Sequence, residues 1–564
     1  MTTTTGMIVT AAASATAMTD QKGRCSIVNL NSTMTDTPFL EDTLMPAWSR
    51  LTPERARVEI PQAIEQAKSA IEAICAVQEP TWDNTFAAME ESSAALMRGW
   101  QRLSHLQAVM DSPACREVMN ELMPEVVMFS SSVTLNPRLY AVLKNAAAQP
   151  WVQELSPVKQ RFIQETLADF RESGADLPDE AKMRYAELST ELAQLSQKFG
   201  ENVLDSTNAW EYVTADPAEI AGLPESARET ARLDALAKGH GTEEAPQWRF
   251  TLQFTSVQPV MTFADCESLR ERVWRAMGAK GTGVYDNAEL INKILTLRVE
   301  KAALLGYERY SDYVTSRRMA GSGTTALSFI NDLHARVKAA FAEEQEAIRR
   351  YAEEQTGTAI PVMKPWDISY WSEKRRKALY DFDTEELRPY YSMQGVLDGM
   401  FSIYAGLYGI RFVPRTTACV AEGESLPEGA VEVWHPEVLF YEVYDEESSE
   451  HLGSFYADWY PRESKRAGAW MNCLSTGLPP MNGAPRVPHL ALMCGNMSRP
   501  VGDKPALLSH YEVETVFHEF GHLLHQVLSN VEVKSLSGCN VAWDFVELPS
   551  QINENWTWES EAID

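Results

Sequence analysis

The segment "TVFHEFGHLLHQVL", residues 515–528, carries three of the ten histidines of a 564-residue chain. Just before it, Ser509 and Glu512 have the S-x-x-E spacing of a capping box at a helix N-terminus. Apolar residues follow at helical spacing, and Asn530 is a suitable stop. The sequence therefore predicts a helix over 510–529, about 20 residues or five and a half turns long.

On this helix, His518 and His522 are four residues apart, so their side chains lie one turn apart on one face. Both imidazoles can reach a single zinc ion. Glu519 is rotated by about 100° from His518, which places its carboxylate beside the ion, where it can take a proton from water. The pattern predicts a zinc hydrolase site. The alternative is an apolar core helix whose histidines bind no metal.

His525 is a rival ligand on the same side of the helix, seven residues after His518. Two turns separate the pair by about 10 Å along the axis, which is too far for all three histidines to share one ion. We therefore expect His525 to be a pocket or structural residue.

A catalytic zinc ion usually has three protein ligands and keeps its fourth position for water. No histidine follows this helix, so the third ligand is expected to be a carboxylate. The candidates are Glu532, Asp544, Glu547, Glu554, Glu559 and Glu561. Glu532 is too close to the helix end to fold back. Glu547 lies in a predicted helical run among apolar neighbours, an unfavourable place for a charge without a partner, which favours it as a ligand. A surface ion pair remains the alternative for Glu547.

The rest of the chain divides by pattern. Residues 53–210 and 265–356 show helical periodicity, and "WRFTLQFTSV", residues 248–257, alternates like a strand. From 405 to 500, short strand-like runs separated by turn residues predict a small sheet. Within it, "HLALMCGNM", residues 489–497, is a candidate edge strand to which an extended segment could add.

Composition limits the possible partners. The net charge of −29 argues against nucleic acid and anionic membrane surfaces, and no apolar run is long enough to cross a bilayer. Eight scattered cysteines without a CxxC indicate free thiols in a reducing compartment, so we expect a cytoplasmic protein. Residues 1–35 lack the basic start of a signal peptide and are predicted to be a disordered extension or an upstream mis-start.

"FHEFGHLLHQVL", followed by "WDFVELPSQINENWTWE", closely resembles the thimet-oligopeptidase family of zinc metallopeptidases. "LGSFYADWYPRESKRAGAW" agrees, and the resemblance extends from about residue 38 to 561. It implies that His518, His522 and Glu547 bind one Zn²⁺ per chain and that Glu519 is the general base. The implied reaction is hydrolysis of internal peptide bonds in short oligopeptides by attack of zinc-bound water.

The resemblance also implies the architecture. We expect a mainly α protein, a two-part helical ellipsoid with a substrate channel and a small β-sheet beside the zinc helix. The expected division is an N-terminal helical domain over 36–210 and a catalytic domain over 211–564. The chain is expected to act as a monomer, without nucleic acid or membrane.

This chain differs from the family pattern in one respect. Family members continue for about a hundred residues after the glutamate ligand, with a Gly/Tyr-rich loop and a histidine that bind substrate and stabilise the oxyanion. Here only 17 residues follow Glu547. We therefore expect C-terminal helices to be missing, and a truncated, catalytically impaired zinc- or peptide-binding remnant is the alternative function.

Overall fold

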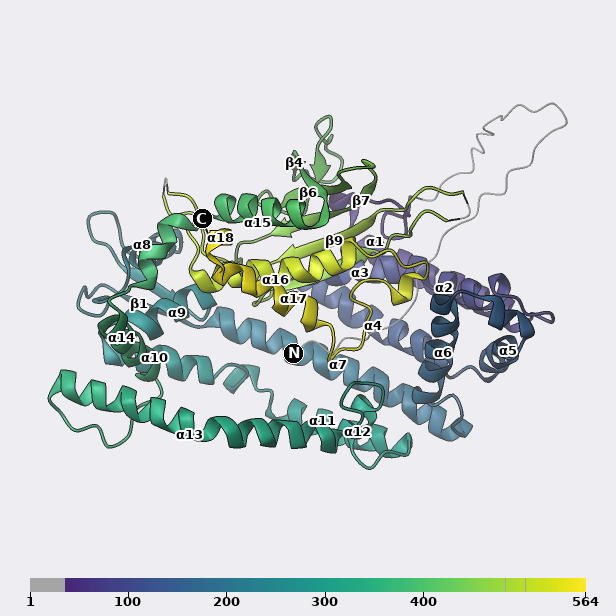
Figure 1. The fold of residues 1–564 in the computed structure, drawn as a ribbon, viewed down its shortest axis with the longest axis horizontal. Helices are drawn as coiled ribbons and strands as arrows, with labels where there is room; N and C mark the ends of the chain where they lie inside the picture. Colours follow the sequence, from purple (N-terminus) through teal and green to yellow (C-terminus); the bar gives the residue numbers. More distant parts are fainter. Residues whose placement is uncertain (1–35, 482, 503, 564) are drawn as a thin grey trace.

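The computed structural model describes residues 36–563, except residues 482 and 503, so the extension predicted for residues 1–35 lies outside the described part. The molecule is elongated and mainly helical, with one small sheet near its middle (Figure 1). The predicted fold class, helices with a small sheet beside the histidine-rich helix, is confirmed.

Helices form the N-terminal part of the molecule. Four of them begin with a polar cap followed by proline, as at Thr52-Pro53 and Ser112-Pro113. The cap side chain accepts a hydrogen bond from a first-turn backbone N–H that has no partner in the helix, and proline has no N–H that would need one. The helices are α1 (Pro53–Cys75), α2 (Ala88–Ser92), α3 (Ala94–Val109), α4 (Pro113–Thr134), α5 (Pro137–Ala147), α6 (Pro157–Glu172) and α7 (Asp179–Ala209).

The middle of the chain is also helical, with one short antiparallel pair of strands. Its helices are α8 (Glu225–Ala237), α9 (Phe254–Phe263), α10 (Glu267–Gly278), α11 (Ala288–Leu304), α12 (Tyr310–Thr315), α13 (Gly323–Thr356), α14 (Ile368–Tyr380) and α15 (Met393–Tyr408). The strand predicted over 248–257 is correct only for β2 (Trp248–Thr251), which pairs with β1 (Glu211–Thr214). Beyond it, Val257 and Val260 are buried three residues apart, the spacing of α9 rather than of a strand.

A five-stranded sheet has the order β3-β6-β7-β9-β8, and β7 and β9 are its parallel pair. The strands are β3 (Ile410–Arg415), β6 (Leu439–Asp445), β7 (His451–Asp458), β8 (Trp470–Ser475) and β9 (His489–Cys494). A two-stranded pair is formed by β4 (Thr417–Ala418) and β5 (Val431–Glu432). All six residues of β9 are buried, so the prediction that residues 489–497 offer a free edge is wrong. A continuous apolar run marks an interior strand, and the two edge strands of the sheet are β3 and β8.

Alternate residues of β9 serve two different cores. Leu490 and Leu492 pack with the N-terminal helices, whereas Ala491 and Met493 pack with α15 and α16 (His510–Val527). This follows from the two-residue period of a strand. The sheet therefore carries α16 on one face, and α17 (Glu547–Glu554) and α18 (Ser560–Ile563) follow beside it (Figure 1). The predicted domain boundary at residue 210 stays a prediction.

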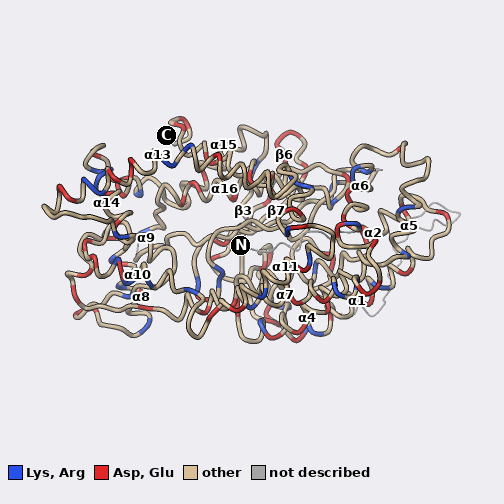
Figure 2. The backbone as a smooth tube through the Cα atoms, turned by 90° about the horizontal axis from the view of Figure 1, so that it is seen from below, with Lys and Arg blue, Asp and Glu red and all other residues tan. Residues whose placement is uncertain are grey.

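Charges of both signs are interspersed along the described chain rather than gathered into one basic tract (Figure 2). Among the described helices, none has the length and apolar composition needed to cross a bilayer.

Candidate metal centre

Helix α16 begins as the sequence predicts. The Ser509 side chain accepts a hydrogen bond from the Glu512 backbone N–H, and the Glu512 carboxylate accepts one from the Ser509 backbone N–H, at 3.3 and 2.7 Å. The Glu512 carboxylate also accepts hydrogen bonds from Ser498 and Arg388. Because Ser498 lies four residues after the end of β9, this capping box fixes the start of α16 relative to the sheet.

The structure brings His518, His522 and Glu547 together. The Nε2 atoms of His518 and His522 lie 3.2 and 3.1 Å from the same oxygen, Oε2 of Glu547. One ligand atom from each residue lies within 4.8 Å of the others. The two imidazole rings stand nearly perpendicular, with centroids 5.0 Å apart. Two nitrogens and one carboxylate oxygen that converge in this way match the donor set of a three-ligand zinc site.

Glu547 reaches this position because α17 packs very closely against α16. At Gly521, between the two histidines, an added Cβ would lie 2.7 Å from Ser550 Cα and 2.8 Å from Pro549 O, so no larger residue fits. The burial that the apolar neighbours predict for Glu547 is not observed. Its side chain is 52% exposed, and the neighbouring Leu548 is exposed too, so no burial cost has to be relieved.

Two rival carboxylates have other partners. Glu532 contacts Ser156 and Lys159, next to α6. Asp544 accepts a hydrogen bond from the Met319 backbone N–H at 2.7 Å. Neither belongs to the group of convergent ligand atoms.

Glu554, one of the candidate third ligands, contacts a histidine instead. Its Oε1 lies 2.7 Å from Nδ1 of His518, on the far side of the ring from Glu547. A carboxylate that accepts the Nδ1 proton fixes the tautomer and leaves Nε2 free for a metal. The spacing Glu547–Glu554, two turns of one helix, could have suggested this pair, but it does not say which carboxylate faces the metal.

Glu519 is 6% exposed, and its Oε2 has no hydrogen-bond partner among the described residues. Burial raises the pKa of this carboxyl to about 7, although the charge of His518 and the backbone N–H of Met471 in β8 lower it. A buried carboxylate oxygen normally has a partner. A carboxyl group with an unpaired oxygen beside the candidate metal ligands is suited to hold and release a proton.

His525 stays apart from the cluster, as the helix geometry predicts. Its Nδ1 faces the Sγ of Cys539 at 3.8 Å, and burial lowers the pKa of His525. Burial raises the pKa of the Cys539 thiol to about 12, so this sulfur is a protonated neighbour rather than a thiolate ligand.

Comparisons with known proteins identify the family of the chain. Residues 260–564 match the model of peptidase family M3, and residues 60–182 match the neurolysin/thimet oligopeptidase N-terminal domain. Oligopeptidase A of Salmonella typhimurium is 36% identical over 534 residues, which are 93% of this chain and 75% of the relative. Organellar oligopeptidase A of Arabidopsis thaliana is 34% identical over 541 residues, 94% of this chain and 66% of the relative. Dipeptidyl carboxypeptidase of Escherichia coli is 27% identical over 527 residues, 92% and 74% respectively.

An HExxH helix with a nearby glutamate on a helical scaffold defines the class of zinc metallopeptidases. The chain belongs to peptidase family M3. Its predicted resemblance to the thimet-oligopeptidase group is thereby confirmed.

Proposed function

We propose that this chain is a zinc-dependent endopeptidase of short oligopeptides, in which His518, His522 and Glu547 hold one zinc ion and Glu519 is the general base. The convergence of the two Nε2 atoms on Glu547, beside the unpaired Oε2 of Glu519, carries the proposal. We also propose that the chain acts as a monomer in the cytoplasm.

A zinc ion at this site would supply a Lewis acid that polarises a carbonyl and acidifies water. The residues of the chain do the remaining work. Glu519 takes a proton at Oε2 as water attacks the scissile carbonyl, and it returns that proton to the leaving amine. Glu554 accepts a hydrogen bond from Nδ1–H of His518, so that the proton stays on Nδ1 and His518 faces the metal with Nε2.

One edge of the sheet suggests how a peptide is aligned. In the described part of the chain, β8 is an edge strand paired with β9, and the backbone N–H of Met471 in β8 lies beside Glu519. An extended peptide can add to such an edge through main-chain hydrogen bonds. Because these hydrogen bonds use only the peptide backbone and do not depend on side chains, this alignment suits short peptides of varied sequence.

An internally quenched fluorescent oligopeptide tests the proposal. The purified chain is expected to cleave it, to stop when a chelator removes the metal, and to recover when zinc is restored. Mass spectrometry of the products separates internal cleavage from removal of C-terminal dipeptides, which the name of one relative describes. A metal-free chain that cleaves equally well would contradict the proposal.

A second candidate, a catalytically impaired zinc- or peptide-binding protein, is favoured by one surface feature. One face of α13 carries an exposed apolar stripe, Leu327, Ile330, Leu333, Val337 and Phe341, each at least 48% exposed. Stripes of this kind usually contact another surface. Zinc binding at one ion per chain without measurable cleavage would select this candidate. Self-association in gel filtration would contradict the proposed monomer.

A further inference from the structure

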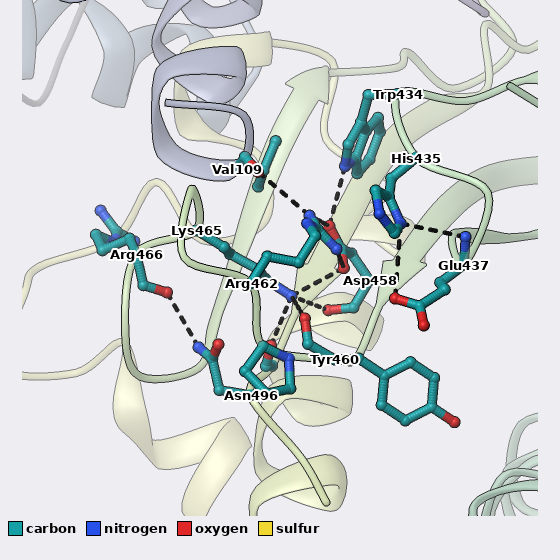
Figure 3. Close-up of polar contacts among 12 residues, drawn as sticks. Val109, Trp434, His435, Glu437, Asp458, Tyr460, Arg462, Lys465, Arg466 and Asn496 are labelled. Atoms are coloured by element: carbon teal, nitrogen blue, oxygen red, sulfur yellow. Dashed lines mark hydrogen bonds and ion pairs between the residues drawn. The ribbon is translucent and has the colours of Figure 1, made fainter. Parts of the chain in front are cut away.

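A second polar cluster lies at the carboxyl ends of the parallel strands β7 and β9, and the catalytic proposal does not use it (Figure 3). Asp458, the last residue of β7, and Lys465 are both completely buried. The Asp458 carboxylate accepts hydrogen bonds from Trp434, Arg462 and Lys465. A fully buried lysine is rare and needs strong compensation.

The Lys465 ammonium is enclosed by oxygen atoms. Its Nζ lies 2.7 Å from the Asp458 carbonyl, 2.8 Å from Asp458 Oδ1, 3.1 Å from the Tyr460 carbonyl and 2.6 Å from the Gly495 carbonyl. An ammonium has three protons to donate, so these acceptors saturate it. Lys465 therefore ties together the end of β7, the loop after it and the residue that follows β9.

The same loop then leads to the free edge strand. Asn496, next to Gly495, donates hydrogen bonds from Nδ2 to the carbonyls of Arg466 and Gly468, at 3.0 and 2.6 Å. Gly468 lies two residues before the start of β8. Lys465 and Asn496 thus connect the entry of β8 to the ends of β7 and β9, in addition to the ladder that pairs β8 with β9.

The outer side of the loop contacts the N-terminal helices. The Arg466 backbone N–H donates to the Ala108 carbonyl at 2.8 Å, and Arg462 donates to the Val109 carbonyl at 3.3 Å. These carbonyls lie at the C-terminal end of α3, where helical acceptors lack partners within the helix. The loop is therefore held from both sides, by the sheet and by α3.

We propose that Lys465 is a positioning residue for peptide substrates: by fixing the loop 459–469 it holds the free edge of β8 in register beside the HExxH helix. The inference rests on the proposed function, since it presumes that a peptide adds to β8. Lys465 touches neither peptide nor metal, so its loss displaces the binding edge without removing a ligand.

Binding measurements in a non-hydrolysing background separate this role from catalysis. The background is zinc-loaded Glu519→Gln, and the probes are a short fluorescent oligopeptide and acetohydroxamate, which binds a zinc ion without needing the strand. Lys465→Met is expected to weaken peptide binding about tenfold to a hundredfold, with zinc content and acetohydroxamate binding unchanged. Lys68→Met, which removes an exposed lysine paired with Glu65, is the matched control. It is expected to leave peptide binding, zinc content and acetohydroxamate binding unchanged.

Because removal of a buried charge can prevent folding, Asn496→Ala provides a second arm. It deletes two hydrogen bonds to the entry of β8 and leaves no charge behind. Weaker peptide binding and faster amide hydrogen exchange at Met471–Cys473, at unchanged zinc content, are expected.

Peptide affinity within about twofold of the background in both variants would overturn the inference, as would a parallel loss of zinc, acetohydroxamate and peptide binding. If the background itself binds zinc but no peptide, the proposed function fails instead, so the two failures can be told apart.

Discussion

Two polar clusters lie beside the same small sheet, and they differ in how completely their atoms are paired. Around Asp458 and Lys465, short hydrogen bonds saturate a buried carboxylate and ammonium. Around His518 and His522, the side chains are partly exposed, and Oε2 of the buried Glu519 has no partner. Saturation gives one rigid arrangement, whereas unpaired donors and acceptors leave room for a ligand. Nε of Arg462 and Oδ1 of Asn496, beside that pair, are also buried without a partner among the described residues, so saturation describes the Asp458–Lys465 ion pair and not every atom around it.

The largest effect is expected from removing a ligand of the open cluster. His522→Ala should reduce zinc from about one ion per chain to nearly none, and hydrolysis should disappear with it, because a neutral imidazole is one of only three protein donors. Metal analysis after gel filtration measures this. His525→Ala, on the same helix but facing Cys539, should retain its zinc. If it lost zinc equally, His525 would belong to the site.

Glu519→Gln should separate metal binding from turnover. The amide cannot take a proton, so kcat is expected to fall by about 10² to 10⁴ with zinc content unchanged. Steady-state kinetics with a quenched peptide measures the change, and Glu514→Gln on the same helix is the control. Full activity of Glu519→Gln would show that another group is the base.

Glu554→Gln tests whether the hydrogen bond between Glu554 and His518 supports zinc binding. Loss of the charged acceptor at Nδ1 of His518 should weaken zinc binding by about 10- to 100-fold, without abolishing it. Competition with a chromogenic chelator measures the affinity. The exposed Glu559→Gln provides the matched control, and an identical affinity in both variants would remove Glu554 from the site.

The smallest effect on zinc binding is expected in the saturated cluster, where a substitution acts on stability. Burial alone would raise the pKa of Asp458, but Arg462 and Lys465 outweigh it and lower this pKa to about 2. A carboxyl with a lowered folded pKa stabilises the fold above its unfolded pKa, near 3.8, and loses that contribution as the pH falls toward 2. Burial lowers the pKa of Lys465 at the same time, so part of this stabilisation is offset within the pair.

Asp458→Asn should therefore unfold more easily than the parent chain at pH 7, and the difference in unfolding free energy should shrink between about pH 4 and about pH 2. Denaturant titrations across this range measure it. A difference that stays constant with pH would mean that the carboxylate charge contributes nothing to the saturated cluster.

Local pattern was sufficient for the zinc helix. The S-x-x-E spacing at Ser509 and Glu512 predicts a capping box, and the four-residue spacing of His518 and His522 places both on one face. These features depend on a single helix, whose 3.6-residue period is known without any tertiary contact.

Features that join distant segments were not predictable in this way. Residues 489–497 have the composition of a strand, but whether a strand lies inside a sheet or at its edge depends on its neighbours, and here β8 takes the edge. Glu547 was favoured through a burial argument that its exposure contradicts, and only the packing of α17 on Gly521 brings it to the histidines.

The sequence by itself therefore determined the helix that carries His518, His522 and Glu519 and the helical class of the fold, since each depends on residues within a few turns of one another. The tertiary structure alone decided the rest: which carboxylate faces the histidines, which one orients His518, and how Lys465 connects two strand ends to a third. The physical reason is that hydrogen bonds and ligand contacts act over about 3 Å, and only folding brings residues that are distant in sequence within that range.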